Sequence, residues 1–163
     1  DKSAAELAKL IFAQLKPSDE QLQRYVYWSG LMHEVGLVVS HTGFHKHGSY
    51  LVEHADIVGF TTREQKLMSR LVLSQKGNLR KLGDALADLD FAKAVLALRL
   101  AVTFMHSRIV LDVSDIRLKM RGKIELEIKQ SWVDLHPTVA YWLQKEIEVW
   151  REVGVEFVVK ASA

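Results

Sequence analysis

The sequence predicts an α+β protein that is mainly α-helical, because two different apolar periodicities follow each other along its 163 residues. Apolar residues recur at helical spacing through the first two thirds, and apolar and charged residues then alternate strictly. The change predicts a helical domain over residues 1–108 and a small β-β-α-β domain over residues 109–163, and 48% hydrophobic residues suffice for a buried core.

The N-terminal part is expected to form several amphipathic helices. Pro17 ends the first, and Ser18 and Asp19 cap the second. Residues 61–65 hold two overlapping capping boxes that start a further helix. The expected helices cover residues 4–15, a segment from Leu22 to near Gly36, residues 49–55, a segment starting at 61–65, and residues 79–89.

The segment from Phe91 to Met105 is apolar on every side, which is typical of a buried helix. Arg99 is its one charged residue between Lys93 and Arg108. A buried guanidinium requires an acidic partner, carbonyl oxygens or a bound anion. We expect a structural Arg99 rather than a ligand contact.

Two alternating segments after residue 115 predict a hairpin around the loop 121–123. This register pairs Leu118 with Leu126, and it also sets Arg117 against Glu127 and Lys119 against Glu125. Apolar pairing and charge pairing therefore favour the same register. We interpret Arg117 and Lys119 as partners in cross-strand charge pairs, not as an open anion site.

The tail is expected to add one helix and one strand. His136 and Pro137 begin the helix, Gly154 ends it, and residues 155–159 alternate as the last strand. Trp132, Trp142 and Trp150 are expected to anchor the core or an interface.

Composition excludes several classes of protein. The chain has no Cys, which fits a reducing compartment, and we expect a cytoplasmic protein. We expect no membrane insertion, because no apolar run reaches about 18 residues. A net charge of +2 does not suggest a nucleic-acid partner. The start at Asp1 suggests an excised or processed chain.

Five of the seven His residues lie between residues 33 and 54, at positions 33, 41, 45, 47 and 54. Imidazoles bind divalent metals, and His together with Lys binds phosphate, so a metal or phosphate site is one interpretation. Loop and helix-end His residues that make ordinary hydrogen bonds are the other, and both stay open.

The His33-Glu34 pair resembles the ligand pair of the His-Asp (HD) metal-dependent phosphohydrolases, which are helical bundles. Glu34 stands where that family has Asp, and no His precedes His33 to supply the first ligand. We therefore interpret His33 and Glu34 as a vestigial pair, or as side chains that satisfy a helix C-terminus, and we expect no metal.

A more specific resemblance lies in three segments: LMHEVGL at 31–37, SHTGFHKHGSYL at 40–51 and ADIVGF at 55–60. They resemble the C-terminal region of the exopolyphosphatase and guanosine pentaphosphate phosphohydrolase (Ppx/GppA) family, and the resemblance extends over essentially the whole chain. Many members carry an aromatic-His-Arg triplet where this sequence has Ser74-Gln75-Lys76.

The resemblance implies that catalysis resides in N-terminal domains with the actin-like ATPase fold, which use Mg²⁺ and would be partners of this chain. It also implies that this region is an accessory module for homodimer formation and for binding polyphosphate or guanosine pentaphosphate. No cofactor is expected in the chain itself, and no catalytic residue is assigned. An active HD-type metallophosphohydrolase and a purely structural interaction domain are the alternatives.

Candidate phosphate-binding residues come from one loop and one basic segment. In the loop, polyphosphate contact and turn architecture stay open. Elsewhere a solvated helix face is the alternative. The candidates are His45, Lys46, His47, Arg63, Lys76, Arg80 and Lys81.

Overall fold

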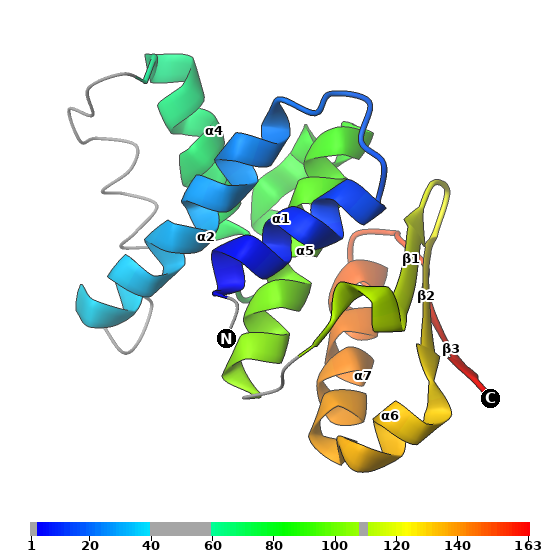
Figure 1. Ribbon diagram of the computed structural model, residues 1–163. Coiled ribbons are helices and arrows are strands. Elements are labelled where there is room, and N and C mark those ends of the chain that lie inside the picture. The colour runs from blue at the N-terminus through cyan, green and yellow to red at the C-terminus, as the bar shows by residue number, and fades with distance from the viewer. Residues whose placement is uncertain (1–2, 40–59, 108–110) are drawn as a thin grey trace.

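The computed structural model describes residues 3–39, 60–107 and 111–163. Helices gather around the long helix α5, and a three-stranded sheet with α6 and α7 lies beside them (Figure 1). This arrangement confirms the α+β, mainly helical class. In the described residues, no helix combines the length and the apolar character that crossing a membrane requires.

Three helices of the N-terminal part begin at polar side chains that cap their N-termini. Ser3 accepts from the Glu6 N–H at the start of α1, Thr61 and Glu64 form a reciprocal capping box, and Asp88 caps α5. The helical elements are α1 (Ala4–Gln14), α2 (Leu22–Val39), α4 (Thr62–Leu73), the 3₁₀ segment η1 (Arg80–Ala87) and α5 (Leu89–His106).

Two expected helices differ from the structure. The second helix continues to Val39 instead of ending near Gly36, so Gly36 does not break it. The predicted helix over 79–89 is a 3₁₀ segment, because Gly83 adopts a φ of 55° that interrupts α-helical geometry. The helix expected over 49–55 lies outside the described residues.

Gly30 allows α1 and α2 to pack at close range. A Cβ at this position would lie 2.7 Å from Ala5 Cα and 3.0 Å from Ala5 Cβ. Ala5, Ala8 and Gly30 are all buried at or near this helix contact. The crossing is therefore set by small residues, which bring the two backbones together.

The second part contains η2 (Val113–Asp115), β1 (Ile116–Met120), β2 (Ile124–Lys129), α6 (Gln130–Leu135), α7 (Pro137–Arg151) and β3 (Phe157–Ser162). The strand order is β1-β2-β3, with β1 antiparallel and β3 parallel to β2. The helix α7 begins at Pro137 as predicted, whereas α6 before it was not predicted.

The hairpin register is confirmed at all five positions, with Leu118 opposite Leu126 and Lys119 opposite Glu125. The expected ion pairs do not follow from it. Among the described residues, neither Arg117 nor Lys119 has a carboxylate oxygen within 4.0 Å, and Glu125 pairs with Lys123 at 3.5 Å instead. Register fixes the Cα positions of long side chains, but it does not fix their tips.

One hydrophobic cluster includes residues from both parts, among them Phe12, Phe104, Leu118 and Trp150. It contains α1 and α5 residues together with the buried faces of β1 and β2. The division into domains at residue 108 stays a prediction.

Candidate functional site

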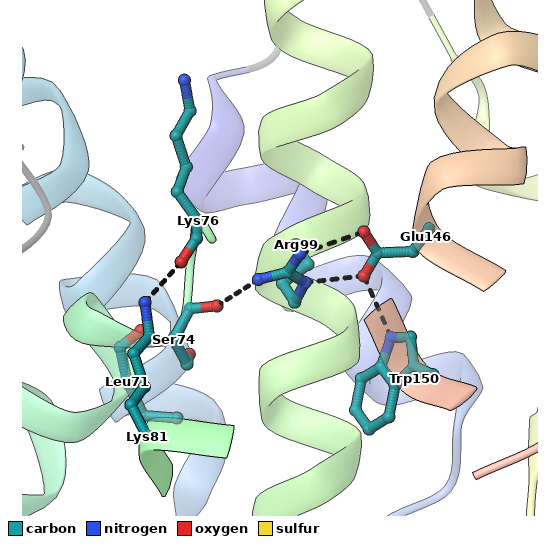
Figure 2. Close-up of polar contacts among 7 residues, drawn as sticks. All are labelled: Leu71, Ser74, Lys76, Lys81, Arg99, Glu146 and Trp150. Carbon is teal, nitrogen blue, oxygen red and sulfur yellow. Dashed lines mark hydrogen bonds and ion pairs between the residues drawn. The ribbon is translucent and has the colours of Figure 1, made fainter. Parts of the chain in front are cut away.

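Arg99 lies in the middle of α5 and makes a buried cluster with α7 (Figure 2). Its Nε donates to Glu146 Oε1 at 2.6 Å, and one terminal nitrogen donates to Glu146 Oε2 at 3.2 Å. The other terminal nitrogen donates to the Ser74 carbonyl at 2.9 Å. Trp150 Nε1 donates to the same Glu146 Oε1 at 2.9 Å.

This cluster satisfies the guanidinium from within the chain. Arg99 and Glu146 expose only 6% and 7% of their side chains, so their charges neutralise each other away from water. The sequence left an acidic partner, carbonyls and a bound anion as possible counterparts, and the structure supplies the first two. This geometry agrees with the structural role expected for Arg99.

A second polar cluster lies at the C-terminal end of α5. His33 is fully buried on α2, and its Nδ1 lies 2.9 Å from Gln75 Oε1. Gln75 Nε2 donates to the Ser29 carbonyl at 2.8 Å. On the other side of the ring, His33 Nε2 lies 3.3 Å from His106 Nε2.

These contacts indicate where the ring protons of His33 and His106 lie. Gln75 uses its NH₂ group on Ser29, so its oxygen must accept from His33 Nδ1–H. In neutral His33, Nε2 is then an acceptor that faces His106. Desolvation lowers the pKa of His106, and the neighbouring Lys76 charge lowers it further, so the neutral imidazole is favoured.

His33 lies within α2, six residues before its end at Val39, and its contacts to described residues include Gln75 and His106. Gln75, in the segment that departs from the family triplet, orients the ring of His33. The side chain of Glu34 lies outside what the structure describes.

The residues that the structure describes contain no group of three or more His, Cys, Asp or Glu side chains placed to hold a metal ion. His33 and His106 supply two imidazoles. The expectation that the chain binds no metal stays a prediction.

Lys76, Arg80 and Lys81 lie close together in sequence after α4. Lys81 Nζ donates to the Lys76 carbonyl at 2.6 Å, as Figure 2 shows, and Arg80 pairs with Glu152 at 3.2 Å. Desolvation lowers the pKa of Lys76. Lys81 thus holds the backbone that follows α4, and Arg80 links η1 to Glu152 at the C-terminal end of α7.

Arg63 lies in the first turn of α4, at the other end of a helix roughly 18 Å long. It lines a groove together with Lys66 and Arg70, but five carboxylates line the same groove: Asp19, Glu64, Asp84, Asp88 and Asp90. This acidic lining disfavours a phosphate chain at Arg63. His45, Lys46 and His47, like His41 and His54, lie outside the described residues.

The three Trp residues have different environments. Trp150 is fully buried, Trp132 is half-buried against Phe104 and His136, and Trp142 is 45% exposed. Trp142 stacks edge-on with exposed Tyr141, so these two form an apolar feature on the surface of α7.

Sequence reasoning missed Glu146, Gln75 and His106. The stripe of α7 offered one signal, because Glu146 lies one turn from Trp150 and so near a buried face. Gln75 and His106 offered no local signal, because their partner His33 is 42 and 73 residues away.

A family model and two similar proteins point to the same protein family. The family model described as Ppx/GppA phosphatase, domain III, matches residues 1–147. A guanosine-5'-triphosphate,3'-diphosphate pyrophosphatase of Aeromonas salmonicida (strain A449) is 26% identical over 153 residues, which cover 88% of this chain and 31% of the relative. The protein of the same name from Vibrio vulnificus (strain YJ016) is 28% identical over 133 residues, 80% of this chain and 27% of the relative. The chain thus spans about a third of the length of these relatives.

Proposed function

Because this chain belongs to the Ppx/GppA phosphatase family, with its domain III matched over residues 1–147, we propose that it is a non-catalytic accessory region of such an enzyme. In this proposal it binds the phosphate chain of the substrate and contributes to a homodimer. Hydrolysis takes place in further domains, for which the actin-like ATPase fold and Mg²⁺ are expected, in the cytoplasm.

The observation that carries the proposal is that two buried polar clusters among the described residues are satisfied by groups of the chain itself. Arg99 and Glu146 neutralise each other, and His33 is held by Gln75 and His106. A catalytic centre instead aims its acid, base or nucleophile at an accessible reacting atom.

The test is phosphate release from polyphosphate and from guanosine-5'-triphosphate,3'-diphosphate by the isolated chain, with Mg²⁺ or Mn²⁺ present. We expect release at the level of a protein-free blank. Turnover that survives repurification and is lost in His33→Ala, a variant that leaves the Arg99 cluster unchanged, would contradict the accessory role.

An active metallophosphohydrolase is the second candidate, favoured by the facing imidazoles of His33 and His106. Among the described residues, no group of three or more His, Cys, Asp or Glu side chains could hold a metal ion, whereas zinc sites usually have at least three protein ligands. Metal analysis of protein purified without chelator separates the two. One tightly bound ion per chain, lost in His33→Ala, would favour the second candidate.

We assign the binding of the phosphate chain to the basic segment after α4, with Lys76, Arg80 and Lys81, and to the loop residues His45, Lys46 and His47. The partial burial of Lys76 and Lys81 beside each other supports this, because charges with less water around them attract an anion more strongly. Titration of labelled polyphosphate against wild type and a Lys76→Gln, Arg80→Gln variant tests it, and equal affinities would refute it.

For the dimer, exposed Tyr141 and Trp142 on α7 are the contact that we propose, with Leu135 at the end of α6, which is 77% exposed. Aromatic side chains of this kind are common anchors of protein interfaces. Sedimentation of wild type and a Trp142→Ser variant at micromolar concentration tests it. A wild-type monomer throughout that range would contradict the proposal.

A further inference from the structure

A basic groove lies between the C-terminal end of α1 and the β1–β2 hairpin. Its volume is about 810 Å³, and its lining includes six basic side chains: Lys16, Lys93, Arg117, Lys119, Arg121 and Lys123. Glu125 is the one acid among the described residues of this lining, and it already pairs with Lys123. Since the whole chain has a net charge of only +2, positive charge is concentrated here.

Gln14 makes the groove a preformed feature. Its Nε2 donates to the carbonyls of Val113 and Ile116 at 3.1 and 3.0 Å, and its Oε1 accepts from the Leu118 N–H at 2.8 Å. One side chain of α1 thus occupies part of the free edge of β1 as a neighbouring strand would. The two walls are therefore held together before any ligand arrives.

Lys93 places a buried positive charge in the groove lining. It is 6% exposed, and its Nζ donates to the Lys16 carbonyl at 3.1 Å. Among the described residues no carboxylate oxygen lies within 4.0 Å of it. Asp90, one turn earlier on α5, is engaged by the Ser18 and Asp19 N–H groups at 2.9 and 2.8 Å. A buried ammonium without a counter-charge is unfavourable, and a bound anion would supply one.

Lys16 has a positive φ angle, a backbone conformation that Gly adopts more easily than Lys. Its φ is 52°, just after the end of α1, where Gly is the usual residue. A side chain in this region costs roughly 1 kcal/mol or more. Lys16 nevertheless lines the groove, and its carbonyl holds Lys93. A Lys residue that only stabilised the negative end of the helix dipole could stand in the last turn of α1, where the backbone is not strained.

We propose that this groove binds an anion with several phosphate groups in a row, such as an inorganic polyphosphate chain. Its cations come from three separate segments, so a chain of charges can contact more of them than a single phosphate can. The described lining contains no aromatic side chain on which a nucleotide base would stack, which favours the inorganic chain. The inference rests on the proposed function, but it names a site that shares no residue with Lys76, Arg80 and Lys81.

The experiment is calorimetric titration of the chain with inorganic tripolyphosphate, at two salt concentrations. The groove variant is Lys16→Gly with Arg121→Ser. The segment after α4 is tested by Lys76→Gln with Arg80→Gln, and Lys129→Gln with Lys145→Gln is the charge-matched control. We expect the groove variant to bind at least tenfold more weakly, with a shallower salt dependence, while the control binds like wild type. Lys16→Gly alone should melt no lower than wild type, because Gly relieves the positive φ.

The outcomes separate this inference from the proposed function. Wild-type affinity in the groove variant, with loss in the Lys76→Gln, Arg80→Gln variant, would overturn the groove and leave the proposed function standing. No binding by the wild-type chain would overturn both the groove and the binding role. Tighter binding of GTP than of tripolyphosphate, or equal binding of an oligoglutamate with the same dependence on Lys16, would overturn the assignment to a phosphate chain.

Discussion

Glu146 lies on α7, a helix with many exposed residues, but removing its side chain should strongly destabilise the protein. In Glu146→Ala, Arg99 keeps only the Ser74 carbonyl as partner, and Trp150 Nε1 loses its acceptor. Both groups remain buried, because Arg99 is 6% exposed and Trp150 is fully buried. The perturbation therefore leaves a charge and a donor without partners in a water-poor region.

The size of the effect follows from these two losses. Breaking a buried ion pair from one side costs about 3–5 kcal/mol, and a buried donor left without an acceptor costs about 1–3 kcal/mol. The two overlap in one cluster, so we expect about 4 kcal/mol in the free energy of unfolding. That is a large share of the roughly 5–15 kcal/mol that stabilises an ordinary domain.

Urea unfolding followed by Trp fluorescence measures this effect. Glu148→Ala, on an exposed position of the same helix, is the matched control and should change stability by less than about 0.5 kcal/mol. The double variant Arg99→Met, Glu146→Leu should be more stable than Glu146→Ala, because no unpaired charge remains. A Glu146→Ala variant within about 1 kcal/mol of wild type would refute the buried pair.

Three further outcomes can be measured in the same way. Gly30→Ala should cost about 1–3 kcal/mol, because its Cβ would meet the backbone of Ala5, and a neutral result would show that α1 and α2 separate freely. Ser29→Ala should be neutral or stabilising, since the buried Ser29 hydroxyl has no hydrogen-bond partner among the described residues; a loss above about 1 kcal/mol would reveal one. The free energy of unfolding should fall as pH drops from about 7.5 through 6.5, because the lowered pKa of His106 lets the unfolded chain bind a proton first. His106→Gln should weaken that dependence, and an unchanged pH profile would contradict it.

The elements that sequence predicted correctly are those whose signals are local. The hairpin register was predictable because two independent criteria, apolar pairing and charge pairing, selected one alignment, and all five pairs occur. The start of α7 was predictable because Pro137 is favourable only in the first helical turn. The 3₁₀ segment η1 was not, because the left-handed backbone at Gly83 overrides a helical pattern on both sides.

Partners of buried polar groups were harder to predict than the groups themselves. The all-apolar surroundings of Arg99 indicated that it needs a partner, yet Glu146 lies 47 residues away on an exposed-looking helix. The basic groove was missed for a related reason. The charges of β1 were interpreted as half of cross-strand pairs, whereas Lys16 and Lys93 reach the same place from two earlier segments of the sequence. Pattern in one strand cannot show which side-chain tips meet across the fold.

The helix α5 connects the polar features described above. Its three basic groups, Lys93, Arg99 and His106, lie roughly 9 and 10 Å apart along the helix axis. Each meets a different part of the chain: the Lys16 carbonyl after α1, Glu146 on α7, and His33 on α2. Lys93 and Arg99 lie on the buried part of α5, so neither can turn to water without moving the helix, whereas His106 is exposed at its C-terminal end. The partners of these groups therefore fix α5 in rotation and along its axis. Among the described residues, no carboxylate oxygen lies within 4.0 Å of Lys93 or His106, so an external anion can act on the helix at Lys93 and a proton at His106.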